Sequence, residues 1–475
     1  MRVKSRVAAS GGGLLLLLAA CATGNVPEPP LEAQPPLAEL EPEVPRELKV
    51  GLLLPLSGNA AELAQDMLDA AQMALFDVGS NELILLPRDT AGTPSGARAA
   101  AEQVIAEGAR LILGPLFNEA VTAVSPVAAA ADVRVLAFSN VVAAAAPGTF
   151  LLGFRPEEQV ERVVRYAVEN VERQPAEPLE QTLGETTSTE AERLVTGPVR
   201  IAGLAPDDAY GATAMAALRR EVLASGGELG ETLFYPPSLA DPSAVIRQIA
   251  AYDRRTAALE RERARLEQLD DEQSEQALRR LETVDTLGAP PFDAIMIADG
   301  GDRLRSVASL LTFFDVDPAT VRFLGTMRWQ DDPRVLQEAA LQGGWFAASA
   351  PESMAAFDAR FEAIYGRPPH QLAALAYDAT ALAVIAARDM GDPAFQSTTL
   401  TNSQGFAGAT GLFRLRGDGL AEHGLAILQV ANGRARTIDP PPASFTDELA
   451  ALQPHGSRGG VTFAARDRRP ATPLR

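Results

Sequence analysis

The feature that most constrains the fold is a regular alternation of apolar runs with stretches of helical periodicity, which begins at Glu47. The first predicted strands are Leu48–Leu54, Leu83–Leu86, Leu111–Gly114 and Val133–Phe138. The segments between them are predicted as helices over Ala60–Val78, Ser95–Ala106 and Val121–Ala131. Continuous apolar runs of this kind are typical of strands buried on both faces, so the pattern predicts a parallel sheet covered by helices on each side.

The same alternation resumes after a polar interruption. The second set of predicted strands is Val199–Leu204, Leu229–Tyr235, Phe292–Ala298 and Val321–Leu324. Two successive blocks favour an α/β fold with two doubly wound parallel-sheet lobes over one very wide sheet. Nearer the end, Gly411–Arg416 and Leu425–Arg436 are predicted as strands, with a turn at Asn432-Gly433 inside the second stretch.

Two segments interrupt the alternation. Glu172–Thr196 is polar and is predicted to be a surface insertion, whereas Asp253–Asp285 is dense in charge and free of Gly and Pro. The apolar residues of the second segment fall on one helical stripe, which predicts a long amphipathic helix or a helical hairpin. A solvated helix lying on its own lobe and a partner-binding arm both remain open. For the arm, the candidate contacts are Arg261, Arg263 and Arg265.

The amino terminus has the order of a secretory signal peptide over residues 1–20: cationic residues, a short apolar core and small residues at the exit. The apolar run is too short to span a bilayer as a helix. Cys21, directly after Leu18-Ala19-Ala20, resembles the lipobox cysteine of bacterial lipoproteins. The resemblance implies acylation of Cys21 and a protein anchored by lipid alone at the periplasmic face of the cell envelope. Ala22 after the cysteine is compatible with sorting to the outer membrane.

Residues 21–46 are rich in Pro and Glu, which predicts an extended linker, and residues 439–475 are predicted to be a disordered tail. Cys21 is the only cysteine, so the fold has no internal disulfide. The formal net charge of −20 argues against nucleic acid or an anionic lipid surface as the main partner. The histidines are widely separated, no phosphate loop or Gly-x-Ser-x-Gly motif occurs, and we therefore expect no metal site, no cofactor and no catalysis.

The order of several motifs resembles the type I periplasmic-binding-protein fold over Glu47–Ile438. The motifs are Val50–Gly58, Leu113–Leu116, Pro206–Gly211 and Gly411–Gly419. The resemblance implies two lobes joined by a three-stranded hinge, with crossings near Arg155, Thr326 and Gly417. Lobe 1 would then hold about 47–155 and 327–416, lobe 2 about 156–326 and 418–438, and the domain 47–438 would carry the insertion 253–285.

A narrower set of motifs resembles penicillin-binding-protein activator lipoproteins. These are Pro55–Gly58, Asp89–Gly92, Leu113–Leu116 and the charged insertion before Phe292. In that family the binding-protein-like domain contacts and stimulates a peptidoglycan synthase, so the resemblance implies a synthase as the partner. The chain departs from the longer members because only a short linker, and no helical-repeat half, separates Cys21 from Glu47.

Ligands of such α/β folds lie at the carboxyl ends of the parallel strands. The candidate cleft residues are Ser57, Asn118, Ser139, Asn140, Tyr210, Asp299 and Tyr377. Leu116–Glu119 and Val141–Ala146 carry no Ser or Thr where amino-acid binders place hydroxyls, which favours loss of amino-acid binding. We therefore expect a non-catalytic activator of a peptidoglycan synthase. The alternative is a solute-binding lipoprotein of an ABC transporter for amino acids or another small polar ligand.

Overall fold

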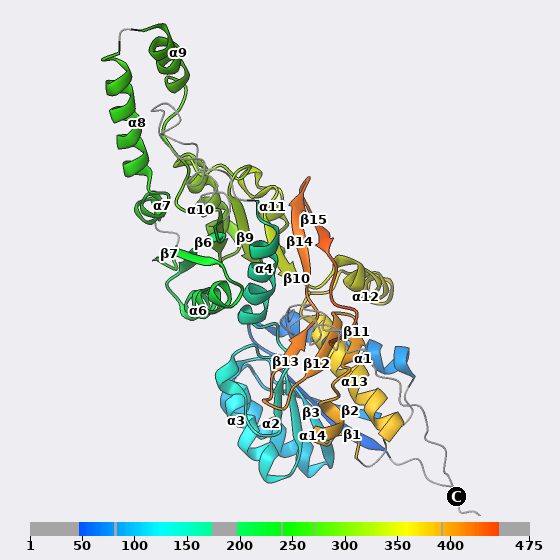
Figure 1. Cartoon of the computed structure of the whole chain (residues 1–475). Coiled ribbons are helices and arrows are strands. Elements are labelled where there is room, and N and C mark those ends of the chain that lie inside the picture. Colours follow the sequence, from blue (N-terminus) through cyan, green and yellow to red (C-terminus); the bar gives the residue numbers. More distant parts are fainter. Residues whose placement is uncertain are drawn as a thin grey trace, which may run out of the picture. The chain divides into compact units, whose positions relative to one another are not determined.

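The computed structural model describes residues 47–445, apart from 80–82, 173–196, 239–240, 270 and 391–392. The predicted signal peptide, Cys21 and the linker over 21–46 lie outside the described residues, as do nearly all of the Glu172–Thr196 insertion and most of the tail. Described residues of the chain form two α/β lobes and a small antiparallel sheet (Figure 1). The predicted fold class is confirmed.

The first lobe is built on a five-stranded parallel sheet in the order β2-β1-β3-β4-β5. The strands are β1 (Leu48–Leu54), β2 (Leu83–Asp89), β3 (Ala109–Leu113), β4 (Arg134–Ala137) and β5 (Thr149–Leu151). The covering helices are α1 (Ala61–Val78) with α13 (Ala373–Met390) on one face, and α2 (Pro94–Ala106) with α3 (Asn118–Ala130) on the other. Small alanines such as Ala71 and Ala101 are fully buried, so the helices pack close to the sheet.

The second lobe is built on a seven-stranded sheet in the order β15-β14-β10-β9-β8-β6-β7. Its strands are β6 (Arg200–Pro206), β7 (Glu228–Tyr235), β8 (Ala294–Ile297), β9 (Arg322–Thr326), β10 (Trp345–Ala348), β14 (Ala426–Ala431) and β15 (Arg434–Asp439). The neighbours from β7 to β10 pair in parallel, and β14 and β15 pair antiparallel. The helices that cover it are α4 (Pro156–Asn170) and α6 (Ala209–Ala224) on one face, and α7 (Ser243–Ile249) and α10 (Gly301–Phe313) on the other.

Short elements complete the lobes. The helices are α11 (Pro333–Leu336), α12 (Pro351–Tyr365) and α14 (Ser397–Leu400), with 3-10 turns η1 (Val142–Ala144), η2 (Met327–Trp329) and η3 (Ala339–Leu341). The third sheet contains β11 (Phe406–Gly408), β12 (Gly411–Leu415) and β13 (Ala421–His423). It is tied to α13 because the Asp378 carboxylate accepts hydrogen bonds from the backbone N–H groups of Ala409 at 2.6 Å and Thr410 at 3.0 Å.

Two expected crossing points lie elsewhere. β10 hydrogen-bonds to β9, so residues 327–348 continue the second lobe and do not return to the first at Thr326. The chain rejoins the first lobe with α12, where Phe357 and Phe361 pack against α1. Likewise, β13 still pairs with β12, so the third crossing follows His423 and not Gly417. Both crossings differ from the expected positions because of strand pairing. A strand as short as Trp345–Ala348 gives no clear signal in the sequence, so its pairing could not be predicted.

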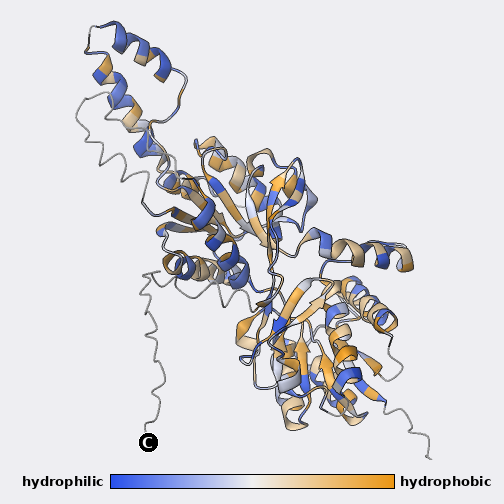
Figure 2. Ribbon diagram, turned by 45° about the vertical axis from the view of Figure 1, so that its right-hand side comes forward, coloured by the Kyte–Doolittle hydropathy of each residue, from blue (hydrophilic) through white to orange (hydrophobic). Residues whose placement is uncertain are grey.

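The charged insertion is a helical hairpin of α8 (Tyr252–Leu266) and α9 (Glu272–Leu281). Its ribbon is mostly hydrophilic, in contrast to the strands of both sheets (Figure 2). Leu259 and Leu266 are buried at 2% and 3% exposure, whereas Leu269 and Val284 of the same predicted stripe are exposed at 43% and 38%. The hairpin therefore buries only part of its apolar stripe.

The beginning of the predicted tail is ordered. β15 extends to Asp439, and Phe445 has 1% exposure, with the Arg414 guanidinium 4.4 Å from its ring centroid. The expectation of disorder from residue 439 is therefore wrong for residues 439–445, because Phe445 packs against the small sheet. Residues 446–475 lie outside the described part of the chain.

Candidate functional site

A cavity of about 810 Å³ lies at the carboxyl ends of β3 and β4 of the first lobe and β9 of the second. The starts of α3, α6 and α13 also contribute side chains to its wall. This is the place at which doubly wound α/β folds bind ligands. Gly114 shapes the loop before α3, since its φ is 88° and a Cβ there would lie 2.3 Å from the carbonyl oxygen of Leu53.

The structure divides the predicted cleft residues into two groups. Those that line the cavity are Asn118, Ser139, Asn140 and Tyr210. Those that do not line it are Ser57, Asp299 and Tyr377. All of the first group directly follow a strand or begin a helix, which is the signal by which they were predicted.

Asp299 follows β8, as expected, but its carboxylate is already hydrogen-bonded to other side chains of the protein. It has no solvent exposure and accepts hydrogen bonds from the Tyr235 hydroxyl and from Arg303, each at 2.8 Å. Burial and the neighbouring Asp299 carboxylate raise the pKa of Tyr235, which keeps its hydroxyl protonated as a donor. Asp299 therefore fixes the loop before α10 and does not offer an acid to a ligand.

The remaining two predicted residues lie away from the cavity. Ser57 is exposed in the loop after β1, and its backbone N–H donates to the Asp89 carboxylate at 3.3 Å. Tyr377 lies on α13, donates its hydroxyl to Asp77 at 3.2 Å and packs against Phe357 of α12. Burial, followed by the effect of Asp77, raises the pKa of Tyr377 to about 12. Neither side chain reaches the cavity: Ser57 stays in an exposed loop, and Tyr377 packs within the first lobe.

Tyr210 forms part of the cavity wall, but its polar atom is already bonded. Its hydroxyl donates to Thr326 Oγ1 at 2.8 Å, and the Arg328 guanidinium lies 4.4 Å from its ring centroid. Burial raises the pKa of Tyr210 to about 12, so the phenol is neutral at physiological pH. The pair places a cation and an aromatic ring together on the second-lobe wall.

Gln159 is a cavity residue that the sequence analysis missed. Its side chain is 2% exposed, donates through Nε2 to the Arg155 carbonyl at 3.2 Å and accepts from the Met327 N–H at 3.0 Å. It therefore joins the start of α4 to the end of β9 directly beneath the cavity. No strand ends at Gln159, so strand-end reasoning alone does not find it.

Arg328 and Asp331 also line the cavity but were not predicted. They could have been, because they follow the predicted strand Val321–Leu324, and ligands of such folds lie at the carboxyl ends of the strands. On the first-lobe side, Gln371 donates from Nε2 to the Asp331 carboxylate, which places side chains from both lobes in one contact. His370 is exposed beside Gln371, and its backbone N–H donates to Asp66 at 2.7 Å. His370 thus lies just before α13, as its position after Pro368-Pro369 indicates.

The apolar part of the cavity wall is larger than its polar part. Its apolar side chains include Leu63, Leu116, Phe117, Phe138, Phe154 and Leu372. The only described ring among these that exceeds one-third exposure is Phe117, at 38%. Such a wall suits a solute with a compact apolar body and a few hydrogen-bonding groups.

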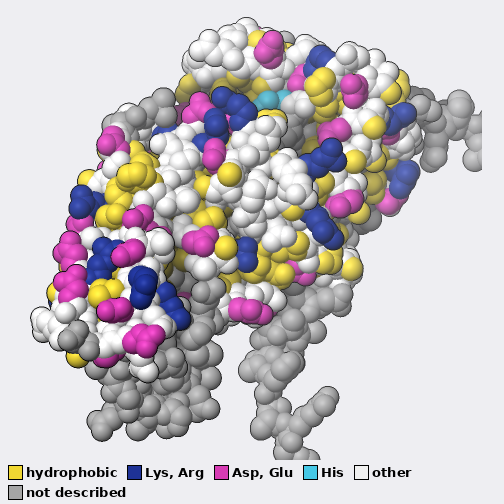
Figure 3. Space-filling model, turned by 90° about the horizontal axis from the view of Figure 1, so that it is seen from above, with side chains coloured by type: hydrophobic (Ala, Val, Ile, Leu, Met, Phe, Trp, Pro, Cys, Tyr) yellow, Lys and Arg dark blue, Asp and Glu magenta, His cyan; other side chains and the backbone are white. Residues whose placement is uncertain are grey.

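The three arginines predicted as partner contacts have different surroundings. Arg263 donates to the carbonyl oxygens of Leu281 and Val284, so it ties α8 to the end of α9. Arg265 is paired with Glu262 at 2.6 Å, and Arg261 is exposed. Basic and acidic side chains are interleaved on the surface seen in Figure 3, and no single-sign patch dominates that view.

Among the described residues, no group of three or more His, Cys, Asp or Glu side chains is placed to hold a metal ion. Within the same part of the chain, none of the helices has the length and apolar character needed to cross a bilayer.

Comparison with known proteins places this architecture in a family. A family model described as periplasmic binding protein matches residues 47–435. A curated relative, an uncharacterized protein of Rickettsia prowazekii, is 26% identical over 121 residues, which is 26% of this chain and 32% of that protein. The match thus spans about a third of that relative's length.

Solved structures show the same fold at low identity. A branched-chain amino acid ABC transporter ligand-binding protein from Burkholderia xenovorans has a TM-score of 0.59 and 17% identity, covering 83% of this chain and 96% of that one. A substrate-binding protein from Sphaerobacter thermophilus has a TM-score of 0.57 and 19% identity, covering 83% and 97%. A Rhodopseudomonas palustris solute-binding protein in complex with 3,4-dihydroxybenzoic acid has a TM-score of 0.53 and 16% identity, covering 83% and 96%. The chain belongs to the periplasmic binding protein family, whose members are non-catalytic binding proteins.

Proposed function

We propose that this protein is a lipid-anchored solute-binding protein of the cell envelope that takes a small molecule into the cavity between its lobes. The observation that carries the proposal is the 810 Å³ cavity at the strand ends, lined by side chains from both lobes. Family membership supports a binding role, and the absence of a catalytic motif in the sequence agrees with it. Delivery to an ABC permease is the use to which similar proteins are put.

Several polar side chains of the cavity wall are already hydrogen-bonded within the protein, and this restricts the kind of solute that the cavity can bind. Tyr210 and Gln159 are bonded to the protein, and Asn140 donates from Nδ2 to the Phe154 carbonyl at 3.2 Å. A ligand that needs many new hydrogen bonds would leave some of its groups unpaired in this cavity, at a cost of about 1–3 kcal/mol each. The wall therefore suits a mostly apolar solute with one anionic or hydrogen-bonding group near Arg328 better than a zwitterionic amino acid.

Isothermal titration calorimetry tests this function with aromatic carboxylates, amino acids and amides as ligands. We expect one aromatic carboxylate to bind with a dissociation constant near or below micromolar, and Arg328→Ala to weaken it about tenfold or more. Ser57→Ala is the matched control, because Ser57 lies outside the cavity wall and its replacement should leave the affinity unchanged. Failure of the whole panel to release or absorb heat at millimolar concentration would contradict solute binding.

A second candidate is the activation of a peptidoglycan synthase, and the hairpin is the feature that favours it. The α8–α9 hairpin leaves Leu269 and Val284 exposed, and its Arg261 has no hydrogen bond or ion pair among the described residues. An exposed apolar stripe with flanking charge is a common feature of protein-binding helices. Activation would require tighter binding to the active conformer of the synthase than to the inactive one.

A pull-down with a purified synthase tests the second candidate. Arg261→Glu, which changes an exposed side chain, should weaken capture, whereas Arg98→Glu on α2 should leave it intact. Arg263→Ala is a poorer probe because it also removes the ties between the two hairpin helices. Equal capture by wild type and Arg261→Glu would exclude the hairpin as the docking surface.

Both proposed functions include a lipid anchor, which depends on the predicted acylation of Cys21. Mass spectrometry of the mature amino-terminal peptide should show an acylated Cys21, and Cys21→Ser should release the protein from the membrane fraction. An unmodified thiol on a full-length chain would contradict the anchor.

A further inference from the structure

The seven-stranded sheet of the second lobe ends in an open strand. β15 lies at one end of the strand order and pairs only with β14 among the described strands (Figure 1). No described backbone group outside β14 hydrogen-bonds to the backbone of β15. In an antiparallel edge strand, the N–H and C=O groups of alternate residues point away from the sheet. β15 therefore offers a row of unused donors and acceptors.

A cavity of about 630 Å³ opens beside this edge. Residues Arg434–Thr437 of β15 line it, together with the β14–β15 turn and Glu352 at the start of α12. Unused backbone groups beside an open cavity are the arrangement in which a sheet accepts a further strand from another chain. The geometry of β15 therefore suits strand addition.

Two arginines give this edge a positive charge. Arg434 and Arg436 are exposed, and they lie on the same face of β15 because successive side chains of a strand point to opposite faces. Among the described residues, neither side chain forms a hydrogen bond, an ion pair or a ring contact. Two unpaired guanidinium groups two residues apart along an edge strand are placed to meet carboxylates at alternate positions of an added strand.

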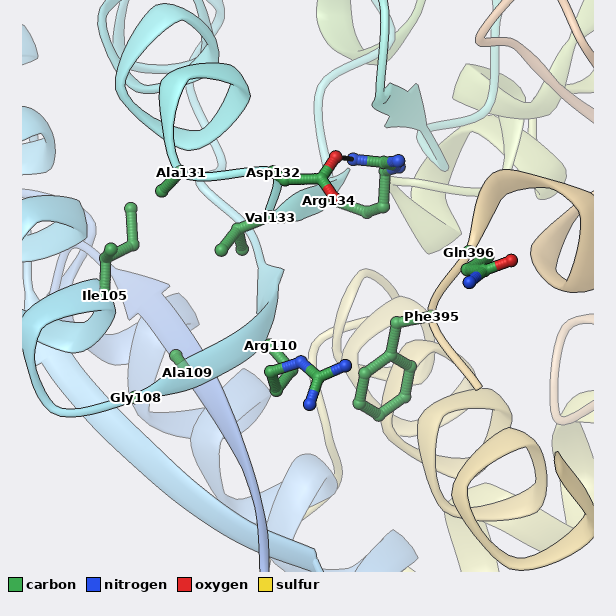
Figure 4. A pocket seen from close by; sticks show the side chains of 10 residues that line it. All are labelled: Ile105, Gly108, Ala109, Arg110, Ala131, Asp132, Val133, Arg134, Phe395 and Gln396. Carbon is green, nitrogen blue, oxygen red and sulfur yellow. Dashed lines mark hydrogen bonds and ion pairs between the residues drawn. The ribbon is translucent and has the colours of Figure 1, made fainter. Parts of the chain in front are cut away.

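Other arginines beside a cavity already have partners. At the smaller cavity of about 280 Å³ by the starts of β3 and β4, Arg134 pairs with Asp132 at 2.8 Å (Figure 4). Arg134 also donates to Ser397 Oγ at 3.1 Å, and Arg110 of the same cavity has a further interaction within the chain. The two arginines of β15 thus differ from these in remaining available to a partner.

The opposite face of β15 carries an acid. Thr437 alternates with Arg436 and so lies on the other face, where its hydroxyl donates to the Glu352 carboxylate at 3.2 Å. Ala435, on the same face as Thr437, packs against the core of the second lobe. An added strand would therefore meet two cations on one face and a carboxylate on the other. This pattern selects acidic side chains at every second position and neutral or basic ones between them.

Charge also decides between a partner protein and a second copy of this chain. Antiparallel pairing of two β15 strands would bring the arginines of one copy beside those of the other, and like charges on neighbouring strands are destabilising. The net charge of −20 on each chain adds to this repulsion. Charged edge strands commonly prevent self-association in this way, while an acidic strand is still admitted.

We propose that β15 is a docking edge for an extended acidic segment of a partner protein, which adds to the sheet as a strand with its carboxylates against Arg434 and Arg436. The edge is separate from the interlobe cavity and from the α8–α9 hairpin. Its failure is therefore distinguishable from the failure of solute binding.

Fluorescence polarisation of the full chain with a labelled peptide tests the edge. The probe, Thr-Glu-Thr-Glu-Thr-Glu-Thr, alternates acidic and neutral side chains. We expect saturable binding that Arg434→Glu combined with Arg436→Glu weakens about tenfold or more. Both positions are exposed, so the double variant should fold, and its melting temperature checks that it does. The matched control is Arg219→Glu combined with Arg254→Glu, which changes the net charge equally at exposed positions outside β15 and should bind as the wild type does.

Two altered peptides separate strand addition from attraction by charge alone. A peptide with Lys in place of Glu should bind the double variant more tightly than the wild type. The acidic peptide methylated at its backbone nitrogens keeps its charge but has no N–H donors, and it should not bind. Equal binding of the methylated and unmethylated peptides, absence of saturable binding, or equal binding by the wild type and the double variant would overturn the proposal. A wild-type dimer that the acidic peptide dissociates would also overturn it, because it would assign the edge to a second copy.

Discussion

Asp378, on α13 of the first lobe, is a buried carboxylate. It has 2% exposure, and its carboxylate accepts from the Thr410 hydroxyl at 2.5 Å in addition to the N–H groups of Ala409 and Thr410. Gly408 is required beside it, because a Cβ at that position would lie 2.3 Å from Asp378 Oδ1. Burial outweighs these hydrogen bonds and raises the pKa of Asp378 to about 6.

This pKa predicts a pH dependence of stability. The folded-state pKa of Asp378, about 6, lies above the ordinary pKa of 3.8 for this side chain, so the folded protein holds the proton more tightly than the unfolded chain does. The contribution is fully present below pH 3.8 and is lost as the pH rises through 6, with a total on the order of 2–3 kcal/mol. Urea unfolding of the wild type and Asp378→Asn at pH values from 4 to 8 measures it. The difference in unfolding free energy between the two proteins should change over this range, and a constant difference would contradict the assignment.

Part of the candidate site could be predicted from polar residues that follow the predicted strands. Asn118, Ser139 and Asn140 could be predicted because each stands just beyond a strand that the apolar runs reveal. Asp299 stands in an equivalent place, but Tyr235 and Arg303 occupy its carboxylate. Tyr235 lies 64 residues away in the sequence, so no local pattern reveals its contact, whereas Arg303 is only four residues beyond Asp299 and that ion pair could have been anticipated.

At the scale of elements, the α8–α9 hairpin has its own small apolar interior. Leu259 and Leu266 are buried, yet neither belongs to the main hydrophobic clusters of the two lobes. At the base of the hairpin, Arg255 is anchored to the lobe through Nε to the Gly288 carbonyl at 2.8 Å and through Nη2 to the Asp315 carbonyl at 3.0 Å. The hairpin should therefore loosen as a unit without unfolding its lobe.

Leu259→Ala tests this independence. Removing a buried leucine side chain costs about 2–5 kcal/mol, and here we expect the loss to be confined to the hairpin. Hydrogen exchange should accelerate about tenfold or more in α8 and α9 while α4 and β6 keep their protection. Leu269→Ala, at an exposed position, is the control and should change little. Faster exchange throughout the second lobe would contradict an independent hairpin.

Phe445 gives a second prediction at this scale. It is buried beneath Arg414, and a Cβ on Gly405 would lie 2.8 Å from its ring. Phe445→Ala should lower the free energy of unfolding by about 3–5 kcal/mol, the usual cost of truncating a buried Phe. Thermal and urea unfolding measure this loss. A stability equal to that of the wild type would indicate that the tail does not pack against the small sheet.

Most elements could be predicted from sequence, because long apolar runs and helical periodicity reflect burial directly. The charged segment was predicted as either a long amphipathic helix or a helical hairpin, and the structure has the hairpin. The Asn432-Gly433 turn between β14 and β15 was predicted from its residue types. β10 could not be predicted in this way: Trp345–Ala348 is short, and its place in the sheet depends on pairing with β9 and β14. The order of residues 439–445 could not be predicted for a similar reason. Their proline-rich composition is typical of a disordered segment, but the burial of Phe445 against the small sheet orders them.

At the scale of the whole molecule, a buried ionic cluster joins two of the segments that pass between the lobes. The Glu158 carboxylate, at the start of α4, lies 2.9 Å from His423 Nδ1 and 3.3 Å from Arg155 Nη2. Arg155 also donates to the Ala421 carbonyl at 3.1 Å, and the His423 ring centroid is 4.4 Å from that of Phe154. The first and third crossings are therefore tied together at the hinge.

A double-mutant cycle with Glu158→Gln and His423→Asn measures this tie. Because both groups are buried and in contact, we expect a coupling free energy of about 1 kcal/mol or more in urea unfolding. Additivity of the two single changes within about 0.5 kcal/mol would mean that the pair does not couple the crossings. Arg98→Ala with Glu102→Ala is the matched surface pair, for which about 0.3–0.5 kcal/mol is expected.

The central claim is that the interlobe cavity holds a small molecule in the cell. Native mass spectrometry of the protein purified from the cells that make it tests this claim most directly. We expect a one-to-one small-molecule adduct on the wild type that is reduced or lost in the Arg328→Ala protein and retained in Ser57→Ala. Wild-type protein that carries no adduct, and gains none when incubated with extract of the envelope's small molecules, would contradict it.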